Sequence, residues 1–190
     1  MRMSPKWGAL LAVPVLAAAA MTPLSLQPGS RVWVEGTSTV RSWHCESTRA
    51  EGGAGVSTTD VAKLSGAAHA QVTVATATLD CRNGTMNGHM RKALKASTVP
   101  TLGFHATSVQ VTPAGAAAGT AEMQGTLSIA GQERPVTITG TVAGESGQLR
   151  VRGTKRIDMR EWGVRPPSLM MGTMRVNPNV TVGFDVVLKP

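Results

Sequence analysis

Apolar and polar residues alternate along most of the chain, a pattern typical of strands that bury one face. In residues 180–188 every even position is apolar, whereas positions 181, 183 and 185 carry Thr, Gly and Asp. Residues 149–159 repeat the alternation, with Leu, Val, Ile and Met on one face and mostly arginine on the other, and Lys155 alone departs from it. The pattern predicts a mainly β protein whose basic outer surface backs an apolar interior.

Two further runs, 121–129 and 136–142, alternate in the same way and are separated by a turn-like segment. We predict that they form a hairpin around residues 130–135, with Gly131, Pro135 and Gly144 as turn residues. The apolar residues expected to point inward are Met123, Leu127, Ile129, Val136, Ile138 and Val142.

One segment has helical rather than strand periodicity. Met86, Met90, Ala93 and Leu94 form an apolar stripe, while Arg91, Lys92 and Lys95 occupy the opposite face. Asn83 or Thr85 can cap the helix, and Pro100 lies just beyond its end. The spacing predicts one short amphipathic helix over about 85–96 that covers one end of the sheet.

The length of 190 residues fits one domain, which we place at 31–190 after a linker at 21–30. A closed sheet of about eight strands has an interior that is either filled by side chains or large enough for one ligand. The strands are rich in Val, Ala, Thr and Gly and poor in large aromatics, which favours an unfilled interior. A methionine stripe is common in ordinary cores, but it also suits a pocket for a flexible chain.

Residues 1–20 resemble a secretory signal peptide, because Arg2 and Lys6 precede a short apolar stretch that ends in four alanines. Cleavage near Ala20 would give a periplasmic or secreted protein; a retained membrane anchor is the alternative. Removal of Arg2 and Lys6 lowers the formal charge from +8 to +6. Nucleic acid is not expected as a partner, since the chain has no Tyr and two Phe for base stacking. An anionic membrane surface stays open, and so does the oligomeric state.

The two cysteines, Cys45 and Cys81, lie at the ends of predicted strands. In an oxidising compartment an even number of cysteines favours a disulfide, here closing a loop of about 36 residues. A metal site that includes the nearby His44 and His89 is the alternative, but the chain lacks CxxC and HxxxH spacing. We therefore predict a Cys45–Cys81 disulfide, no metal and no cofactor.

Several residues could act as acids or bases, but no nucleophile motif or paired-carboxylate signature links them. His105 is expected to point outward if its neighbour Phe104 points inward. The sequence therefore does not indicate an enzyme. The residues that could in principle act as acids or bases are His44, His69, His89, His105, Asp80, Asp158 and Glu161.

The chain resembles the YceI-like family over most of residues 31–190. The specific parts are the helix passage MNGHMRKALKASTVPTLGFHATSV, the hairpin GTLSIAGQERPVTI and the closing stretch that contains PPSLMMG. The resemblance implies an antiparallel, lipocalin-like β-barrel with a helix packed at one end. It also implies export to the periplasm and binding of isoprenoid lipids or isoprenoid quinones inside the barrel.

Together these observations predict a non-catalytic protein that sequesters or carries an apolar, chain-like ligand. The first alternative is a structural or interaction module with a filled core and a basic docking face. A hydrolase or other enzyme is the second alternative. His89 and Arg91 are the candidates for contact with a polar headgroup. The residues expected to line the cavity are Met86, Met90, Leu94, Leu102, Phe104, Leu127, Ile138, Trp43 and Met170.

Overall fold

The computed structural model describes residues 21–190, apart from the side chains of Ala68, Leu169 and Met170. The predicted signal peptide at 1–20 lies outside this range. Within it, no helix has both the length and the apolar character needed to cross a membrane.

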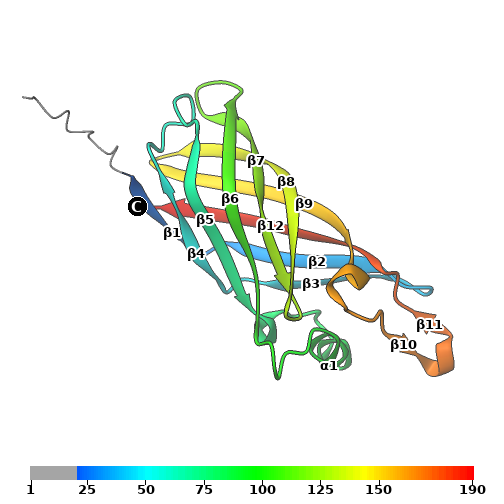
Figure 1. Cartoon of the computed structure of the whole chain (residues 1–190). Coiled ribbons are helices and arrows are strands. Elements are labelled where there is room, and N and C mark those ends of the chain that lie inside the picture. Colours follow the sequence, from blue (N-terminus) through cyan, green and yellow to red (C-terminus); the bar gives the residue numbers. More distant parts are fainter. Residues whose placement is uncertain (1–20) are drawn as a thin grey trace, which may run out of the picture.

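Eight antiparallel strands form a closed barrel, because the first and last strands pair with each other (Figure 1). This confirms the predicted mainly β fold with one short helix. In their order around the barrel the strands are β1 (Thr22–Leu26), β4 (Ala50–Val56), β5 (Gly66–Ala75), β6 (Thr101–Pro113), β7 (Ala118–Ile129), β8 (Gln132–Glu145), β9 (Gln148–Asp158) and β12 (Asn179–Lys189).

Two strands extend the barrel at one end, since β2 (Arg31–Thr37) pairs with the first half of β12 and β3 (Ser42–Ser47) pairs with β2. The short hairpin of β10 (Ser168–Leu169) and β11 (Met174–Arg175) lies at the same end (Figure 1). Residues 22–26 differ from the sequence analysis, which placed them in a linker, because they form β1 and pair with β4 and β12. The chain also contains three short 3-10 segments, η1 (Thr76–Thr78), η2 (Met159–Trp162) and η3 (Met170–Gly172).

Two-residue turns join β7 to β8 and β8 to β9. Both turn residues have positive φ, with values of 50° at Ala130 and 82° at Gly131 in the first turn. Such turns match the twist of the paired strands, and Gly at the second position adopts this φ without strain. The predicted hairpin is therefore present, but Pro135 and Gly144 lie inside β8 rather than in turns. Pro135 is tolerated because β8 pairs with β9 only from Gly140 onward, so this part of β8 is a free edge.

The predicted helix is α1 (Gly84–Ala93), which begins one residue earlier than expected and ends three residues earlier. The Asn83 side chain caps it by accepting a hydrogen bond from the Met86 backbone N–H at 2.9 Å. The helix ends because Lys95 adopts a φ of 56°. The backbone N–H of Ala96 then donates to the Arg91 carbonyl at 2.9 Å, which satisfies a free carbonyl of the last turn.

One half of the barrel is filled with side chains. Val61 and Leu64, from the segment between β4 and β5, are 1% and 3% exposed and close that end. They pack against the inward residues of the surrounding strands, including Leu149 and Leu188. Toward the α1 end of the same barrel the inward side chains of Val182 and Phe184 on β12 are only half-buried. The barrel is therefore solid at one end and hollow at the other.

On the outer face of β12, Asp185 is buried beneath three arginines. Arg150 donates two hydrogen bonds to its carboxylate, from Nε at 2.7 Å and from Nη2 at 2.8 Å. The Nε of Arg152 lies 3.1 Å from the carboxylate and the Nη2 of Arg31 lies 3.4 Å from it. The hydrogen bonds from Arg150 are the main reason that the pKa of Asp185 falls to about 2.

We expect an Asp185→Asn substitution to lower the free energy of unfolding by about 2 kcal/mol at pH 7. The pKa of the carboxyl is about 2 in the folded chain and 3.8 normally, so its stabilisation is present above pH 3.8 and is lost as the pH falls through 2. Urea unfolding at pH 7 and pH 2.5 should show the difference between wild type and variant shrinking at the lower pH. Asp60→Asn is the control, since Asp60 is exposed and pairs only with Lys63. An equal loss for both variants would contradict this account.

Candidate functional site

A cavity of about 420 Å³ occupies the hollow half of the barrel. Its walls are the inward faces of β2, β5, β6, β12 and neighbouring strands, and α1 lies across it. The wall is almost entirely apolar because each of these strands turns its period-two apolar face inward. The apolar residues of the wall include Val32, Val34, Val72, Val74, Leu102, Phe104, Leu127, Ile129, Ile138, Ile157, Met159, Val180, Val182 and Phe184.

The mouth of the cavity lies between α1, the β2–β3 turn and the β10–β11 hairpin. Met86 and Met90 of α1, with Leu94 directly after it, line the cavity and are half-buried, and Leu94 also packs against the neighbouring core residues. Polar side chains reach the wall in this region, and they are Ser38, Arg41, Asn83, Thr85 and His89.

Trp43 of β3 is one of two tryptophans on the β2–β3 side of the wall, the other being Trp33 of β2. The Trp43 indole packs against Gly36 of β2, where an added Cβ would come within 2.7 Å of the ring. Gly36 therefore makes room for the indole. The Trp43 Nε1 is buried and has no hydrogen-bond partner among the described residues.

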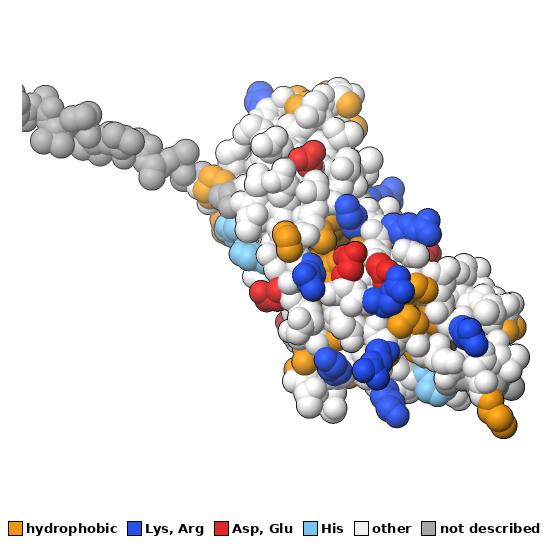
Figure 2. Space-filling view, turned by 45° about the vertical axis from the view of Figure 1, so that its right-hand side comes forward, with side chains coloured by type: hydrophobic (Ala, Val, Ile, Leu, Met, Phe, Trp, Pro, Cys, Tyr) orange, Lys and Arg blue, Asp and Glu red, His pale blue; other side chains and the backbone are white. Residues whose placement is uncertain are grey.

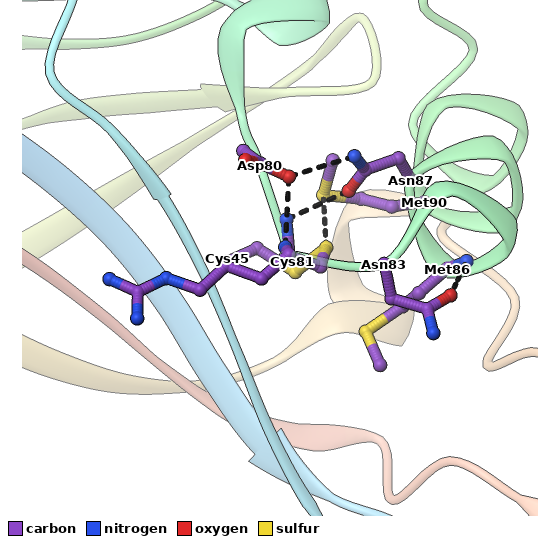
Figure 3. The surroundings of a disulfide bond; sticks show 8 residues. Cys45, Asp80, Cys81, Asn83, Met86, Asn87 and Met90 are labelled. Atoms are coloured by element: carbon purple, nitrogen blue, oxygen red, sulfur yellow. Dashed lines mark hydrogen bonds between the residues drawn. A yellow bond between two sulfur atoms is a disulfide. The ribbon is translucent and has the colours of Figure 1, made fainter.

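The predicted disulfide is confirmed and joins Cys45 of β3 to Cys81, three residues before α1 begins (Figure 3). The Cys81 sulfur also contacts the Met90 sulfur at 3.7 Å. Asn87 strengthens the connection, because its Oδ1 accepts from the Cys81 backbone N–H at 2.7 Å and its Nδ2 donates to Asp80 at 2.9 Å. The hydrogen bond from Asn87 is the main reason that the pKa of Asp80 is lowered. The start of α1 is thus fixed to the barrel wall.

The structure brings together most of the residues that the sequence singled out. Arg91 does not reach the cavity wall; its Nη2 donates to the Ala77 carbonyl at 3.4 Å. His89 lies at the mouth, and the Met170 side chain falls outside the described part of the chain. Contact with a ligand stays a prediction for all of them. The predicted residues that lie on the wall are Trp43, Met86, Met90, Leu94, Leu102, Phe104, Leu127 and Ile138.

Sequence reasoning did not single out several wall residues, among them the valines of β2 and β5 and three residues near the β10–β11 hairpin. The valines of β2 and β5 follow the same alternation as β12, so counting positions 32, 34, 72 and 74 would have found them. Pro167, Met174 and Val176 come from the irregular segment around the β10–β11 hairpin, where no period marks the inward side.

The cavity has little scope for acid–base chemistry. Arg41 and His89 are the only titratable side chains on the described part of its wall. The other histidines named above lie outside the cavity, and His44 pairs with Glu35 at 3.4 Å on the barrel surface. Between residues 21 and 190 no group of three or more His, Cys, Asp or Glu side chains is placed to hold a metal ion. What the site offers chemically is burial of apolar surface.

Fold and cavity together define a closed antiparallel β-barrel with an internal apolar pocket. The family model for the YceI-like domain matches residues 30–188. The chain therefore belongs to the YceI-like family.

Solved structures share this fold at low sequence identity. BcnA of Burkholderia cenocepacia is 22% identical with a TM-score of 0.68, covering 84% of this chain and 96% of its own. A polyisoprenoid-binding domain from Saccharophagus degradans, implicated in plant cell wall breakdown, is 15% identical with a TM-score of 0.65, and the match covers 87% and 97%. The YceI protein of Campylobacter jejuni is 12% identical with a TM-score of 0.52, and the match covers 95% and 90%. No curated protein matches the chain.

Proposed function

We propose that the protein is an exported, non-catalytic binding protein that sequesters or carries an apolar, chain-like molecule inside its barrel. The observation that supports this most directly is the cavity of about 420 Å³ with an almost wholly apolar wall and a mouth at one end. Ligand pockets typically begin at about 300 Å³, so the space is large enough for a small guest. A barrel with a filled core, the main alternative, would lack such a space.

Burial of the ligand is the driving force in this proposal. Removal of apolar surface from water contributes ~25 cal/mol per Å². A chain that buries several hundred Å² would gain roughly 5 to 10 kcal/mol before the costs of ordering are subtracted. No polar contact is needed to reach that range.

Two classes of ligand fit this wall, a polyprenyl lipid and an isoprenoid quinone. The similar Saccharophagus degradans domain, which is named for polyisoprenoid binding, supports a prenyl chain. Arg41 and His89 at the mouth would lie beside any polar headgroup. The Cys45–Cys81 disulfide supports an oxidising compartment such as the periplasm, where the membrane is a source of such molecules.

We expect organic extracts of protein purified from the periplasm to contain a prenyl lipid or quinone above a blank purification, as measured by mass spectrometry. Delipidated protein should then take up decyl-benzoquinone or geranylgeraniol. The quinone should quench tryptophan fluorescence, and Trp33→Phe with Trp43→Phe should remove most of this quenching because both tryptophans lie on the cavity wall.

The result that would overturn the proposal is an extract no richer than the blank, together with no uptake of either probe. Extracts that contain lipid in wild type but no quenching by the quinone would favour the polyprenyl class over the quinone class.

A further inference from the structure

Charge is distributed unequally between the two ends of the barrel. The segments that close the mouth end (38–41, 76–100, 130–131 and 159–178) contain eight Lys or Arg residues and two acidic ones. The segments at the filled end (57–65, 114–117 and 146–147) contain one Lys and one Asp. The basic residues of the mouth end, which we call the basic rim, are Arg41, Arg82, Arg91, Lys92, Lys95, Arg160, Arg165 and Arg175.

All eight side chains of the basic rim are exposed. Within residues 21–190 Arg160 alone among them forms an ion pair, with Asp158. The lower end of the molecule in Figure 2 shows Lys and Arg side chains together with a protruding hydrophobic one. The rim therefore presents a concentrated positive surface to a partner.

Two of the three large hydrophobic side chains that are exposed in the described range lie at this same end. Val40 in the β2–β3 turn is 63% exposed, and Met171 between β10 and β11 is fully exposed with a φ of 52°. Thr39 joins the two loops, since its Oγ1 donates to the Thr173 carbonyl at 3.0 Å and its backbone N–H donates to the Arg175 carbonyl at 3.0 Å. Exposed apolar tips surrounded by basic residues are typical of surfaces that bind the membrane interface.

The mouth of the cavity opens within this surface. Arg41 belongs both to the basic rim and to the cavity wall, and Met174 of the β10–β11 hairpin also lines the wall. A bilayer in contact with the rim would face the cavity entrance. At the filled end Val61 and Leu64 block access to the cavity. The connecting segments there carry balanced charge, so they would not attract an anionic bilayer.

We propose that the mouth end of the barrel docks on anionic lipid bilayers, with the basic rim against the headgroups and Val40 and Met171 inserted between them. The docking itself does not depend on the proposed ligand, although it would bring the cavity to the membrane that holds such ligands. Basic residues near an anionic surface act together, and the attraction weakens with salt. Nucleic acid fits this surface less well, because none of the Trp and Phe side chains in residues 21–190 lies among the exposed residues of the rim for bases to stack on.

The test is co-sedimentation of the mature protein with vesicles made of equal parts phosphatidylglycerol and phosphatidylcholine, without any quinone or polyprenol. Wild type should bind these vesicles, should not bind pure phosphatidylcholine, and should be released by salt. Lys92→Glu with Arg165→Glu should weaken binding by about 10-fold or more. Val40→Ser with Met171→Ser should weaken it by about 3- to 10-fold, since insertion of apolar surface is lost.

The matched control is Lys63→Glu with Lys189→Glu, which makes the same change in net charge away from the basic rim, with Lys63 in the filled-end segments. It should bind as wild type does. Equal weakening in both charge variants would show that net charge rather than the rim governs binding, and would overturn the proposal. Binding to single-stranded DNA but not to the vesicles would overturn it in favour of nucleic acid. Ligand extraction and uptake by the same protein preparations report separately on the proposed function.

Discussion

Replacement of Val34 by Trp is expected to weaken ligand uptake by about 100-fold or more. Val34 lies on the cavity wall, opposite Cys45 on β3 and Val182 on β12, so an indole at this position would project into the hollow part of the barrel. If it displaces about half of the buried chain, the loss of apolar burial is roughly 3 kcal/mol, which corresponds to about 100-fold in affinity. Titration of the delipidated variant with decyl-benzoquinone or geranylgeraniol measures the effect.

The matched control is Glu35→Trp. Glu35 is the next residue on β2 and points to the opposite face of the barrel, where it pairs with His44 on the surface. The Glu35→Trp variant carries the same added side chain outside the cavity, so its ligand uptake should equal that of wild type. Thermal unfolding of both variants should stay close to wild type, because the cavity has room for the indole at position 34. Unchanged uptake by a folded Val34→Trp protein would place the ligand elsewhere.

Removal of the disulfide is expected to have the largest effect on stability. The bridge closes a loop across a sequence separation of 36 residues. In the chain-entropy model such a loop contributes about 3 to 4 kcal/mol by restricting the unfolded chain. Cys45→Ala with Cys81→Ala should therefore lower Tm by about 6 to 15 °C for a domain of this size.

Calorimetry with and without a thiol reductant separates this effect from changes in packing. Reduction should lower the Tm of wild type to near that of the double variant and should leave the variant itself unchanged. A Tm within about 2 °C of wild type for the double variant would contradict the loop argument. Since the bridge fixes the start of α1, hydrogen exchange in residues 82–93 should also rise in the variant.

Much of the fold was predictable because the apolar side of most long strands follows a period of two. The strands of the hairpin around Ala130 and the inward residues of β12 were placed correctly on that basis. The disulfide was predicted from the even number of cysteines in a chain expected to be exported, although Cys45 lies inside β3 rather than at its end and Cys81 lies six residues beyond β5. The end of α1 was not predictable, because Lys95 ends the helix with a positive φ that glycine rather than lysine usually signals.

The site was only partly predictable for a different physical reason. Alternation tells which side chains point inward, but it does not tell which of them meet other side chains and which meet empty space. Phe184 and Leu188 have the same parity on β12, yet Phe184 lines the cavity and Leu188 lies in the filled core. The difference comes from Val61 and Leu64, which reach inward from a connecting segment without periodicity.

Because Val61 and Leu64 fill one end of the barrel, the cavity is a dead-end pocket rather than a channel through the barrel. A bound molecule that enters past α1 would meet no second opening in the described part of the chain, so it would have to leave through the same opening. Exchange would then be strictly sequential, with the resident molecule leaving before the next can arrive, and whichever end of the guest goes in first stays deepest until release.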